Sequence, residues 1–307
     1  MSAFGPPKRA YDFLLSRLQE FTKGRYEDAI EELEEWLGPD TESFWSLGEE
    51  EQDFILSDFI MELRDREDKA PQAGSTLVAA VAKRFLNRRR YAAAHLVTAE
   101  WRKEEPPQSA PAMPEEVAFA CTTLLWAAGL KAEAIAVLLC FCGLLRIGEA
   151  LGLKSEDVVV QAAPHGAVVL LLRKTKTVAA DIERVVLSHP VLVEVIALYA
   201  KGVAAGMRFL PTSYRSVSLA LQAATAAFGF DLKYFRTHSL RRGGATALLL
   251  QGHSMIDIMH MGRWASEKSC RLYLKAGSVI CLRLREGPYR WGRIRALAGL
   301  VLAVVSD

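Results

Sequence analysis

The sequence has few cysteines, no long hydrophobic run and little net charge. Its five cysteines are odd in number and form no CxxC pair, which argues against a disulfide framework and a zinc site. We expect them to be buried small hydrophobic side chains. The longest apolar runs, 134–145 and 296–305, are shorter than the ~20 residues that a membrane-spanning helix requires. The first residues show no secretory signal, so we predict a soluble, intracellular protein without a membrane partner.

The net charge of +2 hides an uneven distribution along the chain. Residues 1–110 carry 15 Lys and Arg against 22 Asp and Glu, whereas residues 111–307 carry 23 against 14. The first part is therefore net acidic and the second net basic. Such asymmetry can mark a region that meets phosphate, although charges that only solvate two surfaces would give the same counts.

The chain is long enough for two domains, and its 51% hydrophobic content supports real cores. Four prolines without apolar periodicity make 104–114 typical of a linker, so we place the boundary at 110/111. Before it, the spacing of apolar residues predicts helical blocks over 26–38, 44–68 and about 77–103. In the second block, the side chains expected to face inward are Phe54, Ile55, Phe59, Ile60 and Leu63.

The second domain is predicted to be mostly helical with a small sheet. Residues 114–153 are typical of two buried helices that break near Gly129. Three short β-branched runs then follow at hairpin spacing, with a turn at 164–166, and they predict a small antiparallel sheet. Helical patterns return from residue 189 onward. The fold class is therefore mainly α, of the α+β type.

Two polar residues interrupt the apolar segment GLLRIGEALGL. Arg146 and Glu149 lie three apart on a helix predicted to be apolar all round, so the arginine must be paired or must meet an anion. A purely structural Arg–Glu pair is the competing interpretation. Lys174 and Lys176, in RKTKT, lie at the predicted tip between the second and third strands, where a lysine is usually only solvated.

The stretch THSLRRGGAT places cationic side chains at the start of an apolar helix. His238 and Arg241 again lie three apart, and Thr237 or Ser239 can cap the helix. A helix N-terminus with such side chains and free backbone N–H groups is an anion site. A surface arginine pair on a capped helix is the alternative.

The order of these residues carries more than any one of them. Trp264 and Tyr273, each of which alone would be a core aromatic, complete the order R-x-x-E, hairpin lysine, H-x-x-R, aromatic and, nine residues later, tyrosine. This order resembles the active-site signature of the tyrosine recombinase, or phage integrase, family over about residues 120–278. The matching residues are Arg146, Glu149, Lys176, His238, Arg241, Trp264 and Tyr273. HSLRRGGAT and GRWAS are similar to recombinases of eukaryotic mobile elements of the DIRS and crypton kind.

The resemblance implies a tyrosine recombinase-like architecture. Residues 1–110 would form a helical, SAM-like core-binding domain that contacts DNA, and residues 111–307 a mostly helical catalytic domain with a small antiparallel sheet. The basic and then apolar tail, 276–307, would pack either on a neighbouring protomer, as is common in the family, or back on its own domain.

The resemblance also implies a site-specific recombinase or integrase that cleaves and rejoins DNA through a 3′-phosphotyrosyl intermediate on Tyr273, as in transposition. Arg146 and Arg241 would stabilise the charge that grows on the phosphate in the transition state. Lys176 would protonate the departing 5′ oxygen. Because the phosphotyrosyl bond keeps the reaction reversible, no ATP is implied.

The remaining family positions imply supporting roles. His238 would assist proton movement, Trp264 would shape the pocket, and Glu149 would orient Arg146. Neither a metal nor another cofactor is implied, because the arginines supply the charge that Mg²⁺ supplies elsewhere.

Double-stranded DNA is the implied partner, bound by a homotetramer on paired sites, in the nucleus if the host is a eukaryote. The side chains expected to contact DNA are basic residues of both domains: Lys83, Arg84, Arg88, Arg89, Arg90, Lys174, Arg242 and Arg263. The alternatives are a type IB topoisomerase-like nicking-closing enzyme, an inactive domesticated DNA-binding remnant, and a helical scaffold whose acidic first half binds a basic partner. Only the first of these alternatives shares a covalent adduct with the recombinase.

Overall fold

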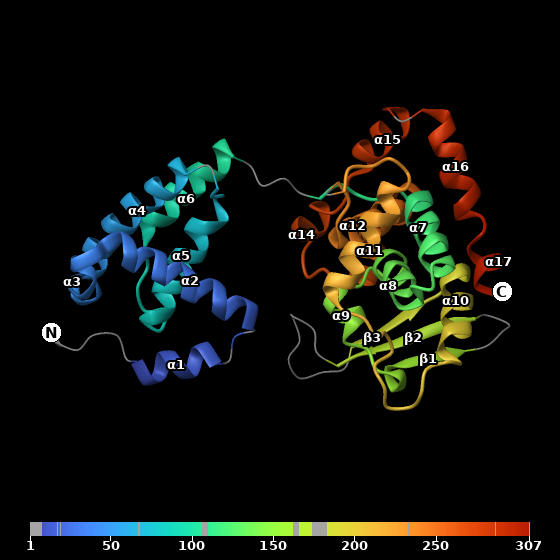
Figure 1. The fold of residues 1–307 in the computed structure, drawn as a ribbon, viewed down its shortest axis with the longest axis horizontal. Coiled ribbons are helices and arrows are strands. Elements are labelled where there is room, and N and C mark those ends of the chain that lie inside the picture. The colour runs from blue at the N-terminus through green and yellow to red at the C-terminus, as the bar shows by residue number, and fades with distance from the viewer. Residues whose placement is uncertain are drawn as a thin grey trace. The chain divides into compact units, whose positions relative to one another are not determined.

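The computed structural model describes residues 8–16, 18, 20–66, 68–105, 110–161, 166–173, 183–232, 234–285 and 287–306. The chain divides into two compact units, Met1–Gln108 and Ser109–Asp307 (Figure 1). Lys174 and Lys176 lie outside the described residues, as does most of the turn predicted at 164–166.

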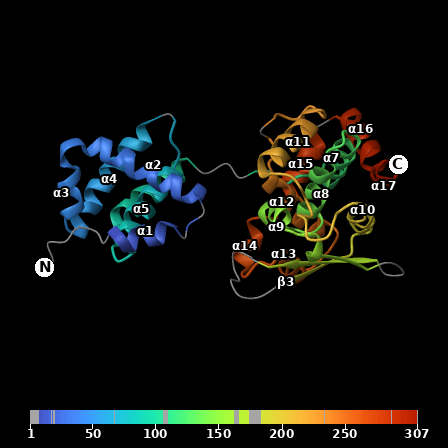
Figure 2. The same ribbon diagram turned by 60° about the horizontal axis from the view of Figure 1, so that its bottom comes forward.

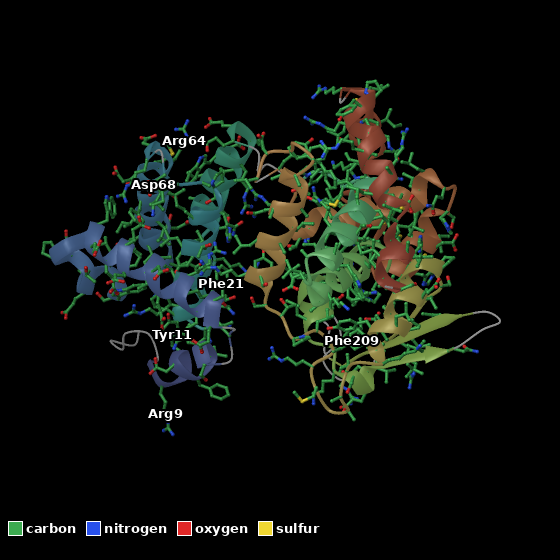
Figure 3. All side chains as sticks on the ribbon, turned by 45° about the vertical axis from the view of Figure 1, so that its right-hand side comes forward. Arg9, Tyr11, Phe21, Arg64, Asp68 and Phe209 are labelled. Carbon is green, nitrogen blue, oxygen red and sulfur yellow. The ribbon has the colours of Figure 1, made fainter. Side chains whose placement is uncertain are left out.

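The first unit is a bundle of helices around its own core. The helices are α1 (Lys8–Ser16), α2 (Glu20–Leu37), α3 (Thr41–Ser46), α4 (Glu49–Asp65), α5 (Gln72–Arg84) and α6 (Ala92–Glu104), with a 3₁₀ turn at Gly38–Asp40. α2 ends where Gly38 takes a positive φ, and α4 packs against α6 while α2 packs against α5. On α1, Arg9 points away from the bundle (Figure 3).

Three details of this unit differ from the prediction. The block predicted over 44–68 is interrupted at Leu47 and Gly48, between α3 and α4. Phe54 was expected to face inward, but it is 60% exposed and Leu56 is buried instead. The buried residues of α4 run from Gln52 through Leu56 to Phe59, a helical stripe that leaves Phe54 on the other face. The block predicted as one helix over 77–103 is two helices, because the chain reverses between α5 and α6, where two residues take positive φ, Leu86 and Asn87.

The second unit surrounds two helices that are almost wholly buried. These are α7 (Glu115–Ala127) and α8 (Lys131–Phe141), which break at Gly129 with a positive φ, as predicted. The others are α9 (Ile147–Leu151), α10 (Pro190–Ala200), α11 (Tyr214–Ala226), α12 (Thr237–Leu250), α13 (Met255–Gly262), α14 (Glu267–Arg271), α15 (Ala276–Arg285), α16 (Pro288–Ala298) and α17 (Val301–Ser306), with a 3₁₀ turn at Ser155–Asp157.

The predicted sheet is present. Its strands are β1 (Val158–Gln161), β2 (Ala167–Leu172) and β3 (Glu183–Leu187), antiparallel in the order β1-β2-β3. Val169 pairs with Val159 on one side and with Val186 on the other. Alternate residues of β2 are buried, so one face of the sheet covers the core while α10 packs beside it (Figures 1 and 2).

The segment after α8 differs from the prediction of one continuous helix. α8 ends at Phe141, and the chain turns through Leu144, which has a φ of 49°. Arg146 has extended backbone and is the residue that precedes α9. It therefore lies at a helix start and not on the face of an apolar helix. From this position its side chain reaches the carboxylate of Glu149.

The Gly-Gly pair of α12 permits a close approach between backbones. A Cβ on Gly244 would lie 1.9 Å from the Phe141 carbonyl oxygen, and one on Gly243 would lie 2.1 Å from the Met113 carbonyl oxygen. α12 can therefore pack directly on α8 and on the start of the second unit. This contact brings the first turns of α12 beside the turn at Leu144.

The C-terminal tail folds back on its own unit. α16 and α17 pack against α7, and Trp291, Ile294, Val301 and Val305 join the core. Of the cysteines, Cys281 on α15 is exposed, contrary to the prediction that all are buried, and Cys142 is half-buried. Across the described ranges, no helix is both long and apolar enough to cross a membrane.

We expect Gly244→Ala to lower the free energy of unfolding by about 3 kcal/mol, because the added methyl group must push α12 away from the α8 backbone. Gly292→Ala on α16 is the control, since apart from its chain neighbours and its own helix backbone nothing lies within 4 Å of the added Cβ there, and it should be neutral or stabilising. Thermal or urea unfolding of both variants measures the difference. Equal stability of the two would contradict the close approach.

Candidate active site

Arg241 is the buried centre of the site. It lies in the second turn of α12 and is 1% exposed. Its Nη1 donates to the carbonyl of Leu144, and its Nη2 donates to the carbonyl of Gly262 at 2.5 Å. Its Nε has no hydrogen-bond partner within the described residues. An arginine placed so deeply with a free N–H group has capacity for a further acceptor.

The N-cap residue of α12 is Arg236, which makes no side-chain cap hydrogen bond, and of the two residues predicted to cap the helix only Ser239 bonds to it. The Ser239 hydroxyl accepts a hydrogen bond from the backbone N–H of Arg236 at 3.0 Å, whereas Thr237 is the first helical residue. The same turn presents His238 at the surface of the unit, one turn before Arg241. The spacing of three therefore places both side chains on one face, as predicted.

Glu149 joins the predicted arginines. Its Oε1 accepts from Arg146 Nη1 at 2.6 Å, and its Oε2 accepts from the Arg146 backbone N–H at 2.9 Å. Oε2 also accepts from Arg263 Nη2 at 2.7 Å and lies 3.9 Å from Arg241 Nη1. The Glu149 side chain is only 6% exposed, while that of Arg146 is 30% exposed. Glu149 therefore fixes the position of Arg146, while part of the Arg146 side chain stays accessible to solvent.

The charges of this cluster shift its pKa values. Burial alone would raise the pKa of Glu149, but Arg263 and the bonds from Arg146 outweigh it and lower that pKa, so the carboxylate is ionised at neutral pH. Burial, followed by the positive charges of Arg146 and Arg263, lowers the pKa of Arg241 to about 10. Arg241 is still a cation at neutral pH.

Trp264 reaches the site through a tight reversal at the end of α13. Arg263 ends the helix with a φ of 57°, and the Trp264 ring folds over Gly262, where a Cβ would lie 1.8 Å from the ring. The Arg241 guanidinium carbon lies 4.6 Å from the Trp264 ring centroid. The aromatic therefore covers one face of the buried arginine.

Tyr273 lies in the turn that follows α14, against the same cluster. Its hydroxyl is 3.1 Å from His238 Nε2, and its ring centroid is 4.8 Å from that of Trp264. The Thr246 hydroxyl donates to the Tyr273 carbonyl at 3.3 Å and accepts from the backbone N–H of Lys275 at 3.1 Å. Thr246 thus holds the turn on α12, a role that no sequence signal indicated.

His238 is neutral at physiological pH. Partial burial, followed by the positive charges of Arg242, Arg241 and Arg146, lowers its pKa below the ordinary value. A neutral imidazole can accept a proton at Nε2, the atom next to the Tyr273 hydroxyl. The pair therefore has the geometry of a hydroxyl beside a general base.

The structure thus brings together the predicted residues Arg146, Glu149, His238, Arg241, Trp264 and Tyr273. Two residues expected to contact DNA are engaged differently. Arg263 is buried, with a side chain 7% exposed, so its role is internal. Arg242 is half-buried, donates to the Ala110 carbonyl at 2.8 Å and lies 5.5 Å from the Tyr273 ring centroid.

The basic residues of the first unit also divide into two kinds. Arg84 pairs with Glu34 at 3.1 Å, and Arg89 donates to Gln52 Oε1 at 2.5 Å, so both are held within the unit. Arg88 and Arg90 are exposed and Lys83 is half-buried. Of the group predicted to contact DNA, only Arg88, Arg90 and in part Lys83 are therefore accessible to it.

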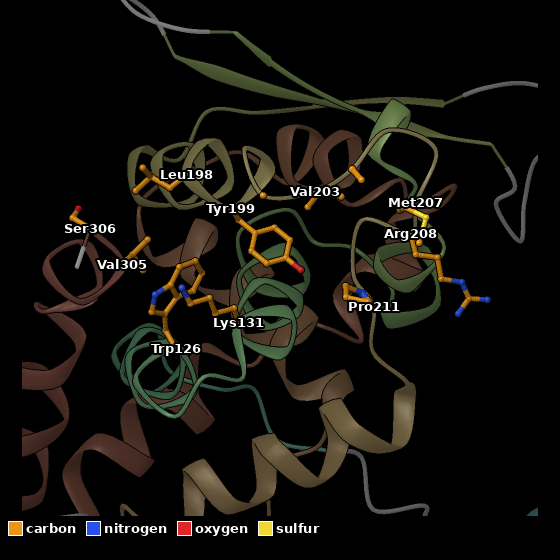
Figure 4. A pocket seen from close by; sticks show the side chains of 12 residues that line it. Trp126, Lys131, Leu198, Tyr199, Val203, Met207, Arg208, Pro211, Val305 and Ser306 are labelled. Atoms are coloured by element: carbon orange, nitrogen blue, oxygen red, sulfur yellow. The ribbon is translucent and has the colours of Figure 1, made fainter.

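A pocket elsewhere in the second unit shares no residue with this cluster. It has a volume of about 650 Å³ and lies among α7, α10, the loop after α10 and the end of α17 (Figure 4). Trp126, Tyr199 and Val305 are among its lining residues. In the candidate site, His238 is exposed and Arg146 is half-buried, whereas Arg241 is buried.

Within the part of the chain that the structure describes, no three His, Cys, Asp or Glu side chains gather as ligands for a metal ion. The fold and the cluster of arginines, histidine, tryptophan and tyrosine together define a protein of the tyrosine recombinase class.

Comparisons with known proteins agree with this class. The phage integrase family model matches residues 120–278, more than half of the chain. The structure of the Tn1549 transposon integrase in complex with transposon right end DNA is similar, with a TM-score of 0.58 and 13% identity over 90% of this chain and 98% of that chain. The XerH site-specific recombinase, bound to a palindromic difH substrate in a post-cleavage complex, has a TM-score of 0.52 and 14% identity over 74% of this chain and 68% of that chain. No curated protein matches the chain.

The chain belongs to the phage integrase family.

Proposed function

We propose that the protein is a site-specific DNA recombinase that cleaves and rejoins strands through a covalent bond from Tyr273 to a 3′ phosphate. The observation that carries the proposal is the 3.1 Å contact between the Tyr273 hydroxyl and His238 Nε2, beside the buried Arg241. The oxygen of Tyr273 would attack phosphorus, and the bond to the 5′ oxygen would break. Rejoining is the reverse step, with a 5′ hydroxyl as nucleophile.

The arginines would neutralise the phosphate during this exchange. Arg146 has an accessible guanidinium that Glu149 holds in place. Arg241 has an unpartnered Nε, but the rings of Trp264 and Tyr273 lie against it, at 4.6 and 5.8 Å from its guanidinium carbon. DNA binding would therefore move the turn that carries Tyr273 and expose Arg241 to the phosphate oxygens.

Lys176 is proposed as the acid that protonates the 5′ oxygen, by the family's pattern alone, because it lies outside the described residues. We propose that the substrate is double-stranded DNA, because the similar structure of the Tn1549 transposon integrase is a complex with transposon right end DNA. Exchange between two sites requires four cleavages, so we propose a homotetramer on paired sites. Residues 1–110 would form a helical core-binding domain that also contacts the DNA. The protein would act in the nucleus if the host is a eukaryote.

Membership of the family does not favour the topoisomerase-like alternative. A topoisomerase would form the same bond but act on one duplex, so strand exchange between two labelled sites separates the two activities. A DNA-binding remnant or a scaffold would form no covalent bond at all.

Tyr273→Phe should abolish the protein–DNA adduct while leaving DNA affinity within about threefold of the wild type, because only the nucleophilic oxygen is lost. Nicked duplexes that carry candidate terminal repeats trap the adduct, and denaturing gels detect it. Tyr289→Phe is the control, since Tyr289 is an exposed tyrosine on α16. An adduct that persists in Tyr273→Phe, or a wild type that binds these sites without forming one, would overturn the proposal.

Cleavage should depend on pH through His238. Because its pKa lies below the usual value of about 6.5, the imidazole is neutral at pH 7, and the rate should fall only as more acidic pH protonates it. His238→Asn should slow cleavage by about 10²-fold and remove this acid limb. Single-turnover rates between about pH 5 and pH 8 measure both effects. An acid limb that survives in His238→Asn would assign the titration to another group.

The exposed arginines of the first unit give a separate test of the DNA surface. Arg88→Ala/Arg90→Ala should weaken binding and reduce the slope of log affinity against log salt by about 2, one phosphate contact for each arginine. The control is Arg64→Ala/Arg66→Ala, which removes the same charge from arginines paired with Glu104 and Glu32. Equal affinity and slope for both double variants would place the contact surface elsewhere.

A further inference from the structure

Arg263 occupies a backbone position that usually belongs to glycine. It ends α13 with φ 57° and ψ 45°, in the left-handed region, and a residue with a Cβ is disfavoured there. A long side chain at such a position is maintained only where the surrounding structure uses it. The side chain of Arg263 is buried, so the use is internal to the protein.

The guanidinium of Arg263 contacts two partners that also hold the phosphate-binding arginines. Its Nη2 donates to Glu149 Oε2 at 2.7 Å, the oxygen that also accepts from the Arg146 backbone. The same Nη2 donates to the Leu144 carbonyl at 3.2 Å, and Arg241 Nη1 donates to that carbonyl as well. Arg263 therefore shares one acceptor with Arg146 and another with Arg241.

Two further contacts fix the position of Arg263. Nη1 donates to the Met261 carbonyl at 3.2 Å, and Nε lies 3.7 Å from a carboxylate oxygen of Glu183, the first residue of β3. Figure 2 shows α13 beside β3. The residue thus connects the end of α13, the start of β3 and the turn before α9, three segments that are remote in sequence.

The charge of Arg263 matters because Glu149 is buried. Around this carboxylate lie the guanidiniums of Arg146, Arg241 and Arg263, and the buried thiol of Cys140 is within electrostatic range. Among the groups that lower the pKa of Glu149, the positive charge of Arg263 has the largest effect. A protonated Glu149 would lose the ion pair that orients Arg146.

We infer that Arg263 is a positioning residue of the recombinase site, whose buried guanidinium binds Glu149 and the Leu144 carbonyl, so that Arg146 and Arg241 stay in the arrangement that binds a phosphate. This inference rests on the proposed function. Arg263 lies next to Trp264 but is not one of the positions of the R-x-x-E, lysine, H-x-x-R, aromatic, tyrosine order. Its role is read from its contacts alone.

The test compares Arg263→Gln and Arg263→Lys, which keep the same backbone position and differ in charge. At saturating DNA, Arg263→Gln should form the adduct about 10²-fold more slowly than the wild type, because a small displacement of the arginines is costly to the rate. DNA affinity should stay within about threefold, since the side chain is buried and does not meet the DNA. Arg263→Lys, which keeps a cation beside Glu149, should recover most of the lost rate.

A second readout depends on the ionisation of Glu149. Without Arg263 the pKa of Glu149 should rise. In a His238→Asn background, which lacks the acid limb of His238, adding Arg263→Gln should therefore make the rate fall at a less acidic pH than in His238→Asn alone. The sign follows because a carboxylate with a depressed pKa is charged above that pKa and loses its ion pairs as pH falls through it. A role in folding alone would lower stability without moving this acid limb.

Controls keep the outcomes distinct. Arg64→Gln removes the same charge from an arginine that pairs with Glu104 in the first unit, and it should leave the rate unchanged. If Arg263→Gln does not fold, Arg263→Gly takes its place, since glycine relieves the left-handed backbone while also removing the guanidinium. A folded Arg263→Gln or Arg263→Gly that cleaves at the wild-type rate overturns the inference. A wild type that forms no adduct overturns the proposed function instead.

Discussion

The candidate site depends on the buried carboxylate of Glu149. Arg146, Arg241 and Arg263 all lie within 4 Å of it, and three cations in so dry a place would repel one another without an anion between them. With the carboxylate present the cluster is still net positive. The excess positive charge lies on the partly accessible guanidinium of Arg146 and at the unpartnered Nε of Arg241. Both groups can therefore interact with an anion that binds at the site.

The fold brings this cluster together at the ends of helices. Arg146 precedes α9, His238 and Arg241 lie in the first turns of α12, Arg263 ends α13, and Tyr273 follows α14. Leu144 and Arg263 both take positive φ, a strain that the packed core of α7 and α8 must offset. Functional groups at helix ends leave the helices themselves free to form a rigid core.

The elements with strong periodicity were predictable from the sequence. The three strands and the break at Gly129 follow from β-branched runs and from a glycine between apolar blocks. At Phe54 the prediction failed because of a tertiary contact. Phe54 was assigned inward although the buried stripe of α4 passes through Gln52 and Leu56, because Gln52 binds Arg89 and the hydroxyl of Tyr91, which lie far along the chain.

The sequence by itself determined the chemistry available: two arginines, a histidine, a tryptophan and a tyrosine in an order that matches a recombinase family. Only the tertiary structure decided which side chains are neighbours. Arg263 is buried on Glu149, whereas Arg88 and Arg90 are exposed. This difference depends on the positive-φ residues that follow α5 and α13 and on the contact between α12 and α8. The charge of a side chain follows from its residue type. Burial and pairing instead arise from packing between segments that are remote in sequence, so no local pattern predicts them.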